Sequence, residues 1–193
     1  MALLNSYGGS QYEFHMRETE TYRILEDVAK VRSEIGVLYR NQFNAAVLQR
    51  NFQEMKLSFT PICLVKPHVF LGTQHPLTKK AEISMEDLRD YPRLSYEQGQ
   101  HNSFYFSEEI QSAAESDKDI VVCDRATLFN LLIGMNGYTI CSGIINTELN
   151  GENIVARPLA VDDYMELGYV LPKERPTSDL TLAYIDLLRQ FVR

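Results

Sequence analysis

Tryptophan is absent from the 193-residue sequence, and cysteine is scarce. The lack of Trp disfavours a sugar-binding cleft, because such clefts depend on aromatic stacking. The three cysteines are Cys63, Cys123 and Cys141, an odd number without a CxxC motif. A disulfide framework or a zinc site is therefore not expected, and reduced thiols in a cytoplasmic protein fit this pattern better.

Basic segments and long apolar runs are missing as well. The formal net charge is -7 and no stretch is dominated by Lys and Arg, so this chain alone is a poor candidate for binding DNA phosphates. No window approaches the ~18 continuous apolar residues of a transmembrane helix. The first ten residues lack the basic start and apolar core of a signal peptide. We expect a cytoplasmic protein that does not bind a membrane.

Motifs for catalysis and for cofactors are not found. The sequence contains no HExxH, GxSxG, GxxxxGK[ST] or GxGxxG pattern, and its four histidines have no metal-ligand spacing. Cys123 and Cys141 lie in apolar segments, which is typical of inert packing residues. We therefore expect no enzymatic activity, no cofactor and no metal.

The first 72 residues alternate between strand and helix patterns. Residues 1–9 are typical of the last turns of a helix that Gly8 or Gly9 ends. Pro61 and Pro67 interrupt the β-rich residues 57–72, which predicts two strands with a crossing between them. The other predicted elements are a half-buried strand at 12–17, a helix at 19–33, a buried strand at 34–39 and a helix at 42–56.

The remaining residues continue the alternation. Ser84 is a good N-cap for a short helix that closes before Pro92, and Asp124 is a good N-cap for a helix at 125–135. Thr177 or Ser178 caps a final helix at 179–192. The other predicted elements are strands at 93–96, 120–123, 138–141, 154–159 and 167–171, a polar loop at 97–103 and a helix at 107–114.

This order of elements predicts an open α/β fold rather than a sandwich. Two groups of strands and helices lie on either side of the Pro-rich crossing, and the last strand and helix return to the first group. Two lobes joined by two crossings enclose a cleft between them. Ligands of open α/β sheets lie beyond the carboxyl ends of the strands.

Three segments resemble the effector-binding domain of LysR-type transcriptional regulators. Residues 34–39 (EIGVLY) resemble the strand that reads DlGil in that family. Residues 72–96 resemble the stretch in which HPL precedes a helix and a short strand, and residues 121–143 resemble the segment in which a helix and G-Gi lead into a strand. The resemblance runs from about residue 12 to residue 192 and depends on the order and spacing of these segments.

The resemblance implies an α/β fold of two Rossmann-like lobes, similar to periplasmic binding proteins. Lobe I is expected to comprise residues 1–63 and 164–193, and lobe II residues 64–163. The family's N-terminal winged helix-turn-helix is missing, as are the first strand of the effector domain and most of its first helix. In the family that strand lies inside the first sheet, so its loss leaves unpaired backbone groups. We expect the sequence to be a fragment of a longer protein.

Candidate ligand contacts follow three of the predicted strands. Arg40 can meet a carboxylate through its planar guanidinium, Gly99 allows close approach of the backbone, and Arg125 opens a helix whose free amides attract anions. For each of these positions an ordinary solvated loop is the alternative interpretation. The candidate ligand-binding residues are Tyr39, Arg40, Asn41, Tyr96, Glu97, Gln98, Gly99, Thr139 and Ser142.

The resemblance implies a sensor of a small polar or anionic metabolite that controls transcription. Such a regulator is expected to be a dimer, or a tetramer at full length, and to contact DNA only through a domain absent from this chain. One alternative is a stand-alone solute-binding protein of the same bilobed fold, against which the lack of a signal peptide counts. Another is an enzyme on that scaffold, against which the lack of catalytic motifs counts.

Overall fold

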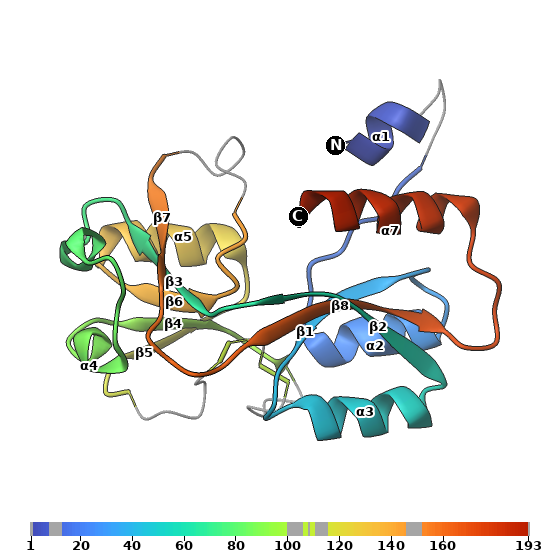
Figure 1. Ribbon diagram of the computed structural model, residues 1–193, viewed down its shortest axis with the longest axis horizontal. Coiled ribbons are helices and arrows are strands. Elements are labelled where there is room, and N and C mark those ends of the chain that lie inside the picture. Colours follow the sequence, from blue (N-terminus) through green and yellow to red (C-terminus); the bar gives the residue numbers. More distant parts are fainter. Residues whose placement is uncertain are drawn as a thin grey trace.

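Two separate β-sheets contain all the strands of the computed structural model (Figure 1). The model describes residues 2–7, 13–99, 106–107, 109–110, 116–145 and 152–192. One sheet has three strands in the order β1-β8-β2, and the other has five strands in the order β5-β4-β6-β3-β7. The sheets lie in different halves of the molecule, which gives the two-lobed α/β fold that the sequence predicts.

The three-stranded sheet is built around a central strand from late in the chain. Strands β1 (Gly36–Arg40) and β2 (Leu57–Val65) both pair antiparallel with β8 (Met165–Pro172). Helices α2 (Thr21–Ala29) and α3 (Ala45–Glu54) cover one side of this sheet, and α7 (Asp179–Phe191) lies on the other (Figure 1). The core under α2 and α3 consists of Leu25, Val28, Leu38, Leu48, Phe52, Leu57 and Val170.

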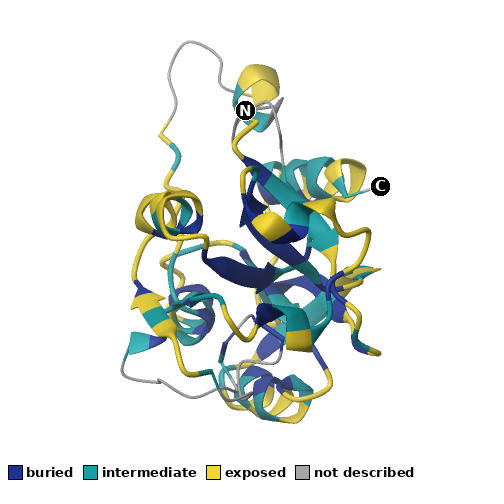
Figure 2. Ribbon diagram, turned by 90° about the vertical axis from the view of Figure 1, so that its left-hand side faces the viewer, coloured by how far each residue is buried: buried dark blue, intermediate teal, exposed yellow. Residues whose placement is uncertain are grey.

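The five-stranded sheet is mixed. Strand β4 (Arg93–Tyr96) runs parallel to β5 (Asp119–Val122) and β6 (Tyr138–Cys141), while β3 (His68–Gly72) pairs antiparallel with β6 and β7 (Ile154–Pro158). Helix α5 (Arg125–Gly134) packs on this sheet, and the short helices η1 (Pro76–Lys79) and α4 (Met85–Leu88) lie at its edge. Figure 2 shows the buried residues along the strands and the exposed ones on the outer helix faces.

Pro61 and Pro67 interrupt strand pairing as the sequence predicts. Pro61 lies in β2 at a register shift against β8, and β2 is an edge strand, so the missing N–H of Pro61 leaves an outer ladder position unused. Strand β2 ends at Val65, and β3 begins in the other sheet directly after Pro67. The chain crosses here and returns between β7 and β8. The residue limits given above for the two lobes stay a prediction.

The strand predicted over residues 12–17 is wrong. Residues 13–20 have no regular structure, and Tyr12 lies outside the described residues. Alternating apolar residues form a strand only beside a pairing partner, and the described residues place no strand along this segment. The short N-terminal helix is confirmed as α1 (Ala2–Tyr7), whereas Gly8, Gly9 and most of the helix predicted at 107–114 lie outside the described residues.

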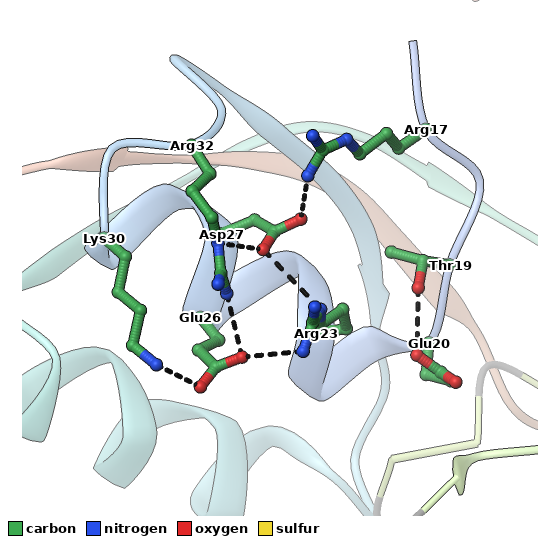
Figure 3. A network of polar contacts seen from close by, with 8 residues as sticks. All are labelled: Arg17, Thr19, Glu20, Arg23, Glu26, Asp27, Lys30 and Arg32. Carbon is green, nitrogen blue, oxygen red and sulfur yellow. Dashed lines mark hydrogen bonds and ion pairs between the residues drawn. The ribbon is translucent and has the colours of Figure 1, made fainter. Parts of the chain in front are cut away.

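Ion pairs hold this irregular segment against α2 (Figure 3). The side chain of Asp27 is only 4% exposed, and its Oδ2 accepts a hydrogen bond from Arg17 Nη1 at 3.1 Å. Among the described residues, its Oδ1 accepts no well-aligned hydrogen bond and is stabilised by ion pairs with Arg32 Nε at 2.7 Å and Arg23 Nε at 3.6 Å. Three guanidinium groups therefore converge on one buried carboxylate, so this carboxylate fixes the path of the chain before and after α2.

His75, the histidine of the HPL motif, has a structural role. The residue is 1% exposed, its Nδ1 accepts a hydrogen bond from Leu77 N at 3.1 Å, and its Nε2 lies 3.0 Å from Asn136 O. These two contacts require a neutral ring with the proton on Nε2, because only an unprotonated Nδ1 accepts. Burial lowers the pKa of His75, and the hydrogen bond to Asn136 opposes this shift in part. His75 thus caps η1 and joins it to the end of α5.

None of the helices that the described residues form is long and apolar enough to cross a membrane.

Replacing Asp27 should destabilise the chain strongly, because its carboxylate is buried and paired with three arginines. We expect Asp27→Ala to lower the free energy of unfolding by about 2 kcal/mol, because charged hydrogen bonds to a buried carboxylate are lost. Glu54→Ala is the matched control, since it removes the exposed pair with Arg50 and should change the free energy of unfolding much less. Urea unfolding of both variants measures the difference, and equal losses would contradict the role of Asp27.

The stability of the chain should depend on the charge of His75. Because its pKa is lowered in the folded state, the unfolded chain takes up a proton at higher pH than the folded chain. The contribution of the neutral His75 ring to the free energy of unfolding is complete above the ordinary histidine pKa of about 6.5. This contribution is lost as the pH falls from there through the lower pKa that His75 has in the folded chain. His75→Asn should therefore flatten the fall in unfolding free energy below about pH 7, whereas His15→Asn, at an exposed position, should leave it unchanged. Identical pH profiles for the wild type and His75→Asn would rule this out.

Candidate functional site

A cavity of about 140 Å³ lies where the two sheets meet. Tyr39 at the end of β1 and Met165 at the start of β8 line it from the three-stranded sheet. The other lining residues belong to the second half of the fold: Phe70, Tyr96, Glu109, Arg125, Leu128, Phe129, Thr139, Ile140, Cys141, Ser142 and Ile144. The cavity therefore combines an apolar wall with a small number of polar side chains, as small-molecule sites usually do.

A hydrogen bond between two hydroxyl groups joins the sheets inside the cavity. The hydroxyl of Tyr39 donates to Ser142 Oγ at 2.9 Å, and the backbone N–H of Ile144 donates to the same oxygen at 3.3 Å. The turn after β6 holds Ser142 in place through Gly143, which has a φ of 74°. A side chain at Gly143 would meet the ring of His68 at 2.5 Å, so only glycine fits here.

The carboxylate of Glu109 is buried and lines the cavity, although it was not among the predicted site residues. Glu109 is 8% exposed, and its Oε1 accepts a hydrogen bond from the backbone N–H of Tyr96 at 3.1 Å. Its Oε2 accepts from the hydroxyl of Ser107. The residue follows a polar segment without clear periodicity, so no sequence pattern pointed to it.

The N-terminus of α5 supplies the cationic group of the cavity. Asp124 caps this helix as predicted, with its Oδ1 accepting from Thr127 N at 2.8 Å, and the hydrogen bonds from Thr127 lower the pKa of the Asp124 carboxyl. Arg125 Nη2 donates to Glu18 Oε1 at 2.7 Å. Glu18 lies in the irregular segment before α2, so this ion pair is a second link between the two halves of the fold.

The structure brings four of the predicted site residues together in the cavity, namely Tyr39, Tyr96, Thr139 and Ser142. Arg40 is placed elsewhere: its guanidinium pairs with Glu166 and lies 4.6 Å from the ring centroid of Phe59. Asn41 is buried and organises the start of α3, because its Oδ1 accepts from Phe43 N at 2.9 Å and from Asn44 N at 3.0 Å.

The residues that follow β4 do not line the cavity. The backbone N–H of Glu97 donates to Val122 O at 2.8 Å, which extends the pairing of β4 with β5, and the Glu97 side chain is exposed. Gln98 is buried with no hydrogen bond to its Oε1 among the described residues. Gly99 has a φ of 56° and lies beside the Glu20 side chain. These three residues lie at the junction of the two halves, near the N-terminus of α2.

Nucleophilic chemistry finds no support in this cavity. Burial raises the pKa of the Cys141 thiol to about 12, and the thiol lies 3.6 Å from His68 O, so Cys141 stays protonated at neutral pH. Within the part of the chain that the structure describes, no three His, Cys, Asp or Glu side chains are grouped so that they could hold a metal ion. The cavity is suited to binding by hydroxyl groups, one carboxylate, one guanidinium and apolar contacts.

Comparison with known proteins finds one family. The family model described as LysR substrate binding domain matches residues 10–193. No curated protein sequence matches the chain.

Solved structures share the fold at low sequence identity. HinK, a LysR family transcriptional regulator from Pseudomonas aeruginosa, has a TM-score of 0.63 at 16% identity over 98% of this chain. The effector binding domain of QuiR in complex with shikimate has a TM-score of 0.61 at 15% identity, covering 98% of this chain and 86% of that one. A BenM variant's effector binding domain has a TM-score of 0.66 at 16% identity, covering 98% and 84%. The chain spans 63% of HinK and 66% of another matched Pseudomonas aeruginosa protein.

The raised pKa of Cys141 has a chemical consequence. At pH 8 a thiol reagent such as DTNB should modify the exposed Cys123 quickly and the folded chain's Cys141 far more slowly, because burial raises the pKa of the Cys141 thiol and the thiolate is the reactive form. Cys123→Ser should remove the fast phase and leave the slow one. Rapid labelling of Cys141 in the folded chain, identified by peptide mapping, would contradict the protonated state.

Proposed function

The chain belongs to the LysR substrate-binding domain family, and on this premise we propose that it senses a small molecule that binds in the cavity between its two sheets. The family consists of regulatory domains of transcription factors rather than of enzymes. The effector binding domain of QuiR, a neighbour in fold, was solved with shikimate, which supports a small molecule as the kind of ligand. The proposal concerns the place of binding and the residues that make contact.

The observation that carries the proposal is the hydrogen bond between Tyr39 and Ser142. It spans the two sheets, and it lies in the cavity itself. A ligand that accepts a hydrogen bond from the Tyr39 hydroxyl or donates one to Ser142 Oγ competes with this bond or extends it. The ligand thereby alters the free-energy difference between arrangements of the two lobes. Only a ligand that binds two arrangements with different affinities can shift their populations.

Four hydroxyl groups and one guanidinium are the proposed polar contacts of the ligand. They belong to Tyr39, Tyr96, Arg125, Thr139 and Ser142, which come from both halves of the fold. Phe70, Leu128 and Phe129 supply apolar surface. The proposed set does not include Arg40, Asn41, Glu97, Gln98 or Gly99, because these five residues do not line the cavity.

In a complete regulator, the arrangement of the two lobes that the ligand favours would act on attached DNA-binding domains. We propose that the chain works as part of a homo-oligomer, a dimer or a tetramer, and that the lobe arrangement is transmitted through that assembly to DNA. The matched structures share 15–17% identity with this chain, which supports the common fold.

The proposal is tested by a thermal-shift screen against amino acids, sulfur metabolites and small organic acids. A ligand of the folded state raises the melting temperature in a dose-dependent way. For a compound that does so, Tyr39→Phe and Ser142→Ala should each weaken binding by about three- to tenfold, because a single hydrogen bond is worth about 0.5–1.5 kcal/mol.

Tyr164→Phe is the matched control, since it removes a hydroxyl from a side chain that is exposed and outside the cavity. It should bind as the wild type does. If a compound binds equally to all three variants, it does not use this cavity. If no compound of any chemical class binds a chain that melts cooperatively, the proposed function is wrong.

A further inference from the structure

Glu109 is a buried acidic group that faces the cavity, and among the described residues Arg93 attracts it electrostatically but forms no ion pair with it. It lines the cavity, is 8% exposed and accepts one hydrogen bond on each oxygen, from Tyr96 N and from the Ser107 hydroxyl. In the described part of the chain no Lys, Arg or His forms an ion pair with it. An ionised carboxylate offers about four acceptor positions, and the described residues fill two of them.

The cations nearest to this region are already matched with other carboxylates. Arg93 makes two hydrogen bonds to Asp119, at 2.6 and 2.8 Å, and Arg125 makes two to Glu18, at 2.7 and 3.1 Å. Of these charged residues only Glu109 and Arg125 line the cavity, and Glu109 is more buried than either Asp119 or Glu18. A buried charge that lacks an opposite charge is costly, and a cation brought by the ligand offsets that cost.

The size and the wall of the cavity restrict the rest of the ligand. A cavity of about 140 Å³ is close in size to an engineered apolar cavity of about 150 Å³ that holds benzene. Phe70, Leu128 and Phe129 form an apolar surface that suits a ring or a short branched chain. Together, the wall and the carboxylate match a compact apolar body with one charged end.

We propose that the ligand of this cavity carries an ammonium group that donates to Glu109, attached to an apolar body about the size of one six-membered ring. This inference rests on the proposed function and makes the ligand class specific. It differs from the expectation drawn from the sequence, which was a small polar or anionic metabolite and did not take Glu109 into account. Arg40 pairs with Glu166 outside the cavity and Arg125 pairs with Glu18 at its wall, so among the described lining residues Glu109 is the charged group without an ion pair.

Three probes of matched size test the charge of the ligand: benzylamine, benzyl alcohol and benzoate. Calorimetric titration of the wild-type chain at neutral pH should show benzylamine binding about tenfold or more tightly than either of the others. A hydrogen bond to a charged group is stronger than one between neutral groups, and a tenfold ratio of affinities corresponds to about 1.4 kcal/mol. This comparison uses the wild type alone, so it holds even if a variant does not fold.

Variants then assign the preference to Glu109. Glu109→Gln should weaken benzylamine by about tenfold and leave benzyl alcohol within about twofold of the wild type, which also reports that the cavity is intact. Glu97→Gln is the matched control, since it removes an exposed carboxylate just after β4 that does not line the cavity, and it should change neither affinity. A preference for benzylamine that survives Glu109→Gln would overturn the assignment.

The other outcomes separate this inference from the proposed function. Tighter binding of benzoate than of benzylamine, or no binding of any of the three probes at millimolar concentration, overturns the ammonium ligand. The proposed function survives either result if another compound binds with an affinity that depends on Tyr39 and Ser142. It fails only if the wider screen also finds nothing that uses those two residues.

Discussion

Strand β8 has to pair with both β1 and β2, although it follows a strand of the other sheet. The chain leaves the three-stranded sheet after β2 and returns to it at β8, and the register places Val65 opposite Met165 at this point. The two crossings therefore lie side by side and act as one connection between the lobes. Tyr39 pairs with Leu167, two residues into β8, so the end of β1 is carried to the same junction. The position of the cavity follows from this pairing.

Local patterns were sufficient for most of the fold. Strands β4 and β6 have the predicted ends, and Ser84, Asp124 and Ser178 cap helices through side-chain hydrogen bonds to the backbone. Each of these signals acts within about four residues, so neighbours in sequence are enough to read it. The segment at 13–20 shows where this fails. Its alternation is a local signal, but a strand also needs a partner, and this segment is fixed instead by the ion pair of Arg17 with Asp27 and that of Glu18 with Arg125.

The site was predictable in part for the same reason. Tyr39, Tyr96, Thr139 and Ser142 lie within or next to the short strands β1, β4 and β6, and these strands can be read from the sequence. Arg40 follows Tyr39 directly, and successive residues of a strand point to opposite faces, so Arg40 contacts Phe59 and Glu166 while Tyr39 lines the cavity. Glu109 was not predictable, because its burial depends on contacts with Tyr96 and Ser107 that no spacing reveals. The proposed charge of the ligand therefore depends on which charged groups of the cavity already form ion pairs within the protein.

The central claim is that a small molecule binds between the two sheets and acts on both. Hydrogen–deuterium exchange with and without a bound compound tests it most directly, because backbone protection reports on each sheet separately. The account predicts that a ligand slows exchange at the ends of both sheets, in residues 36–40 and 138–145. Protection confined to one sheet, or found only away from these residues, would contradict it.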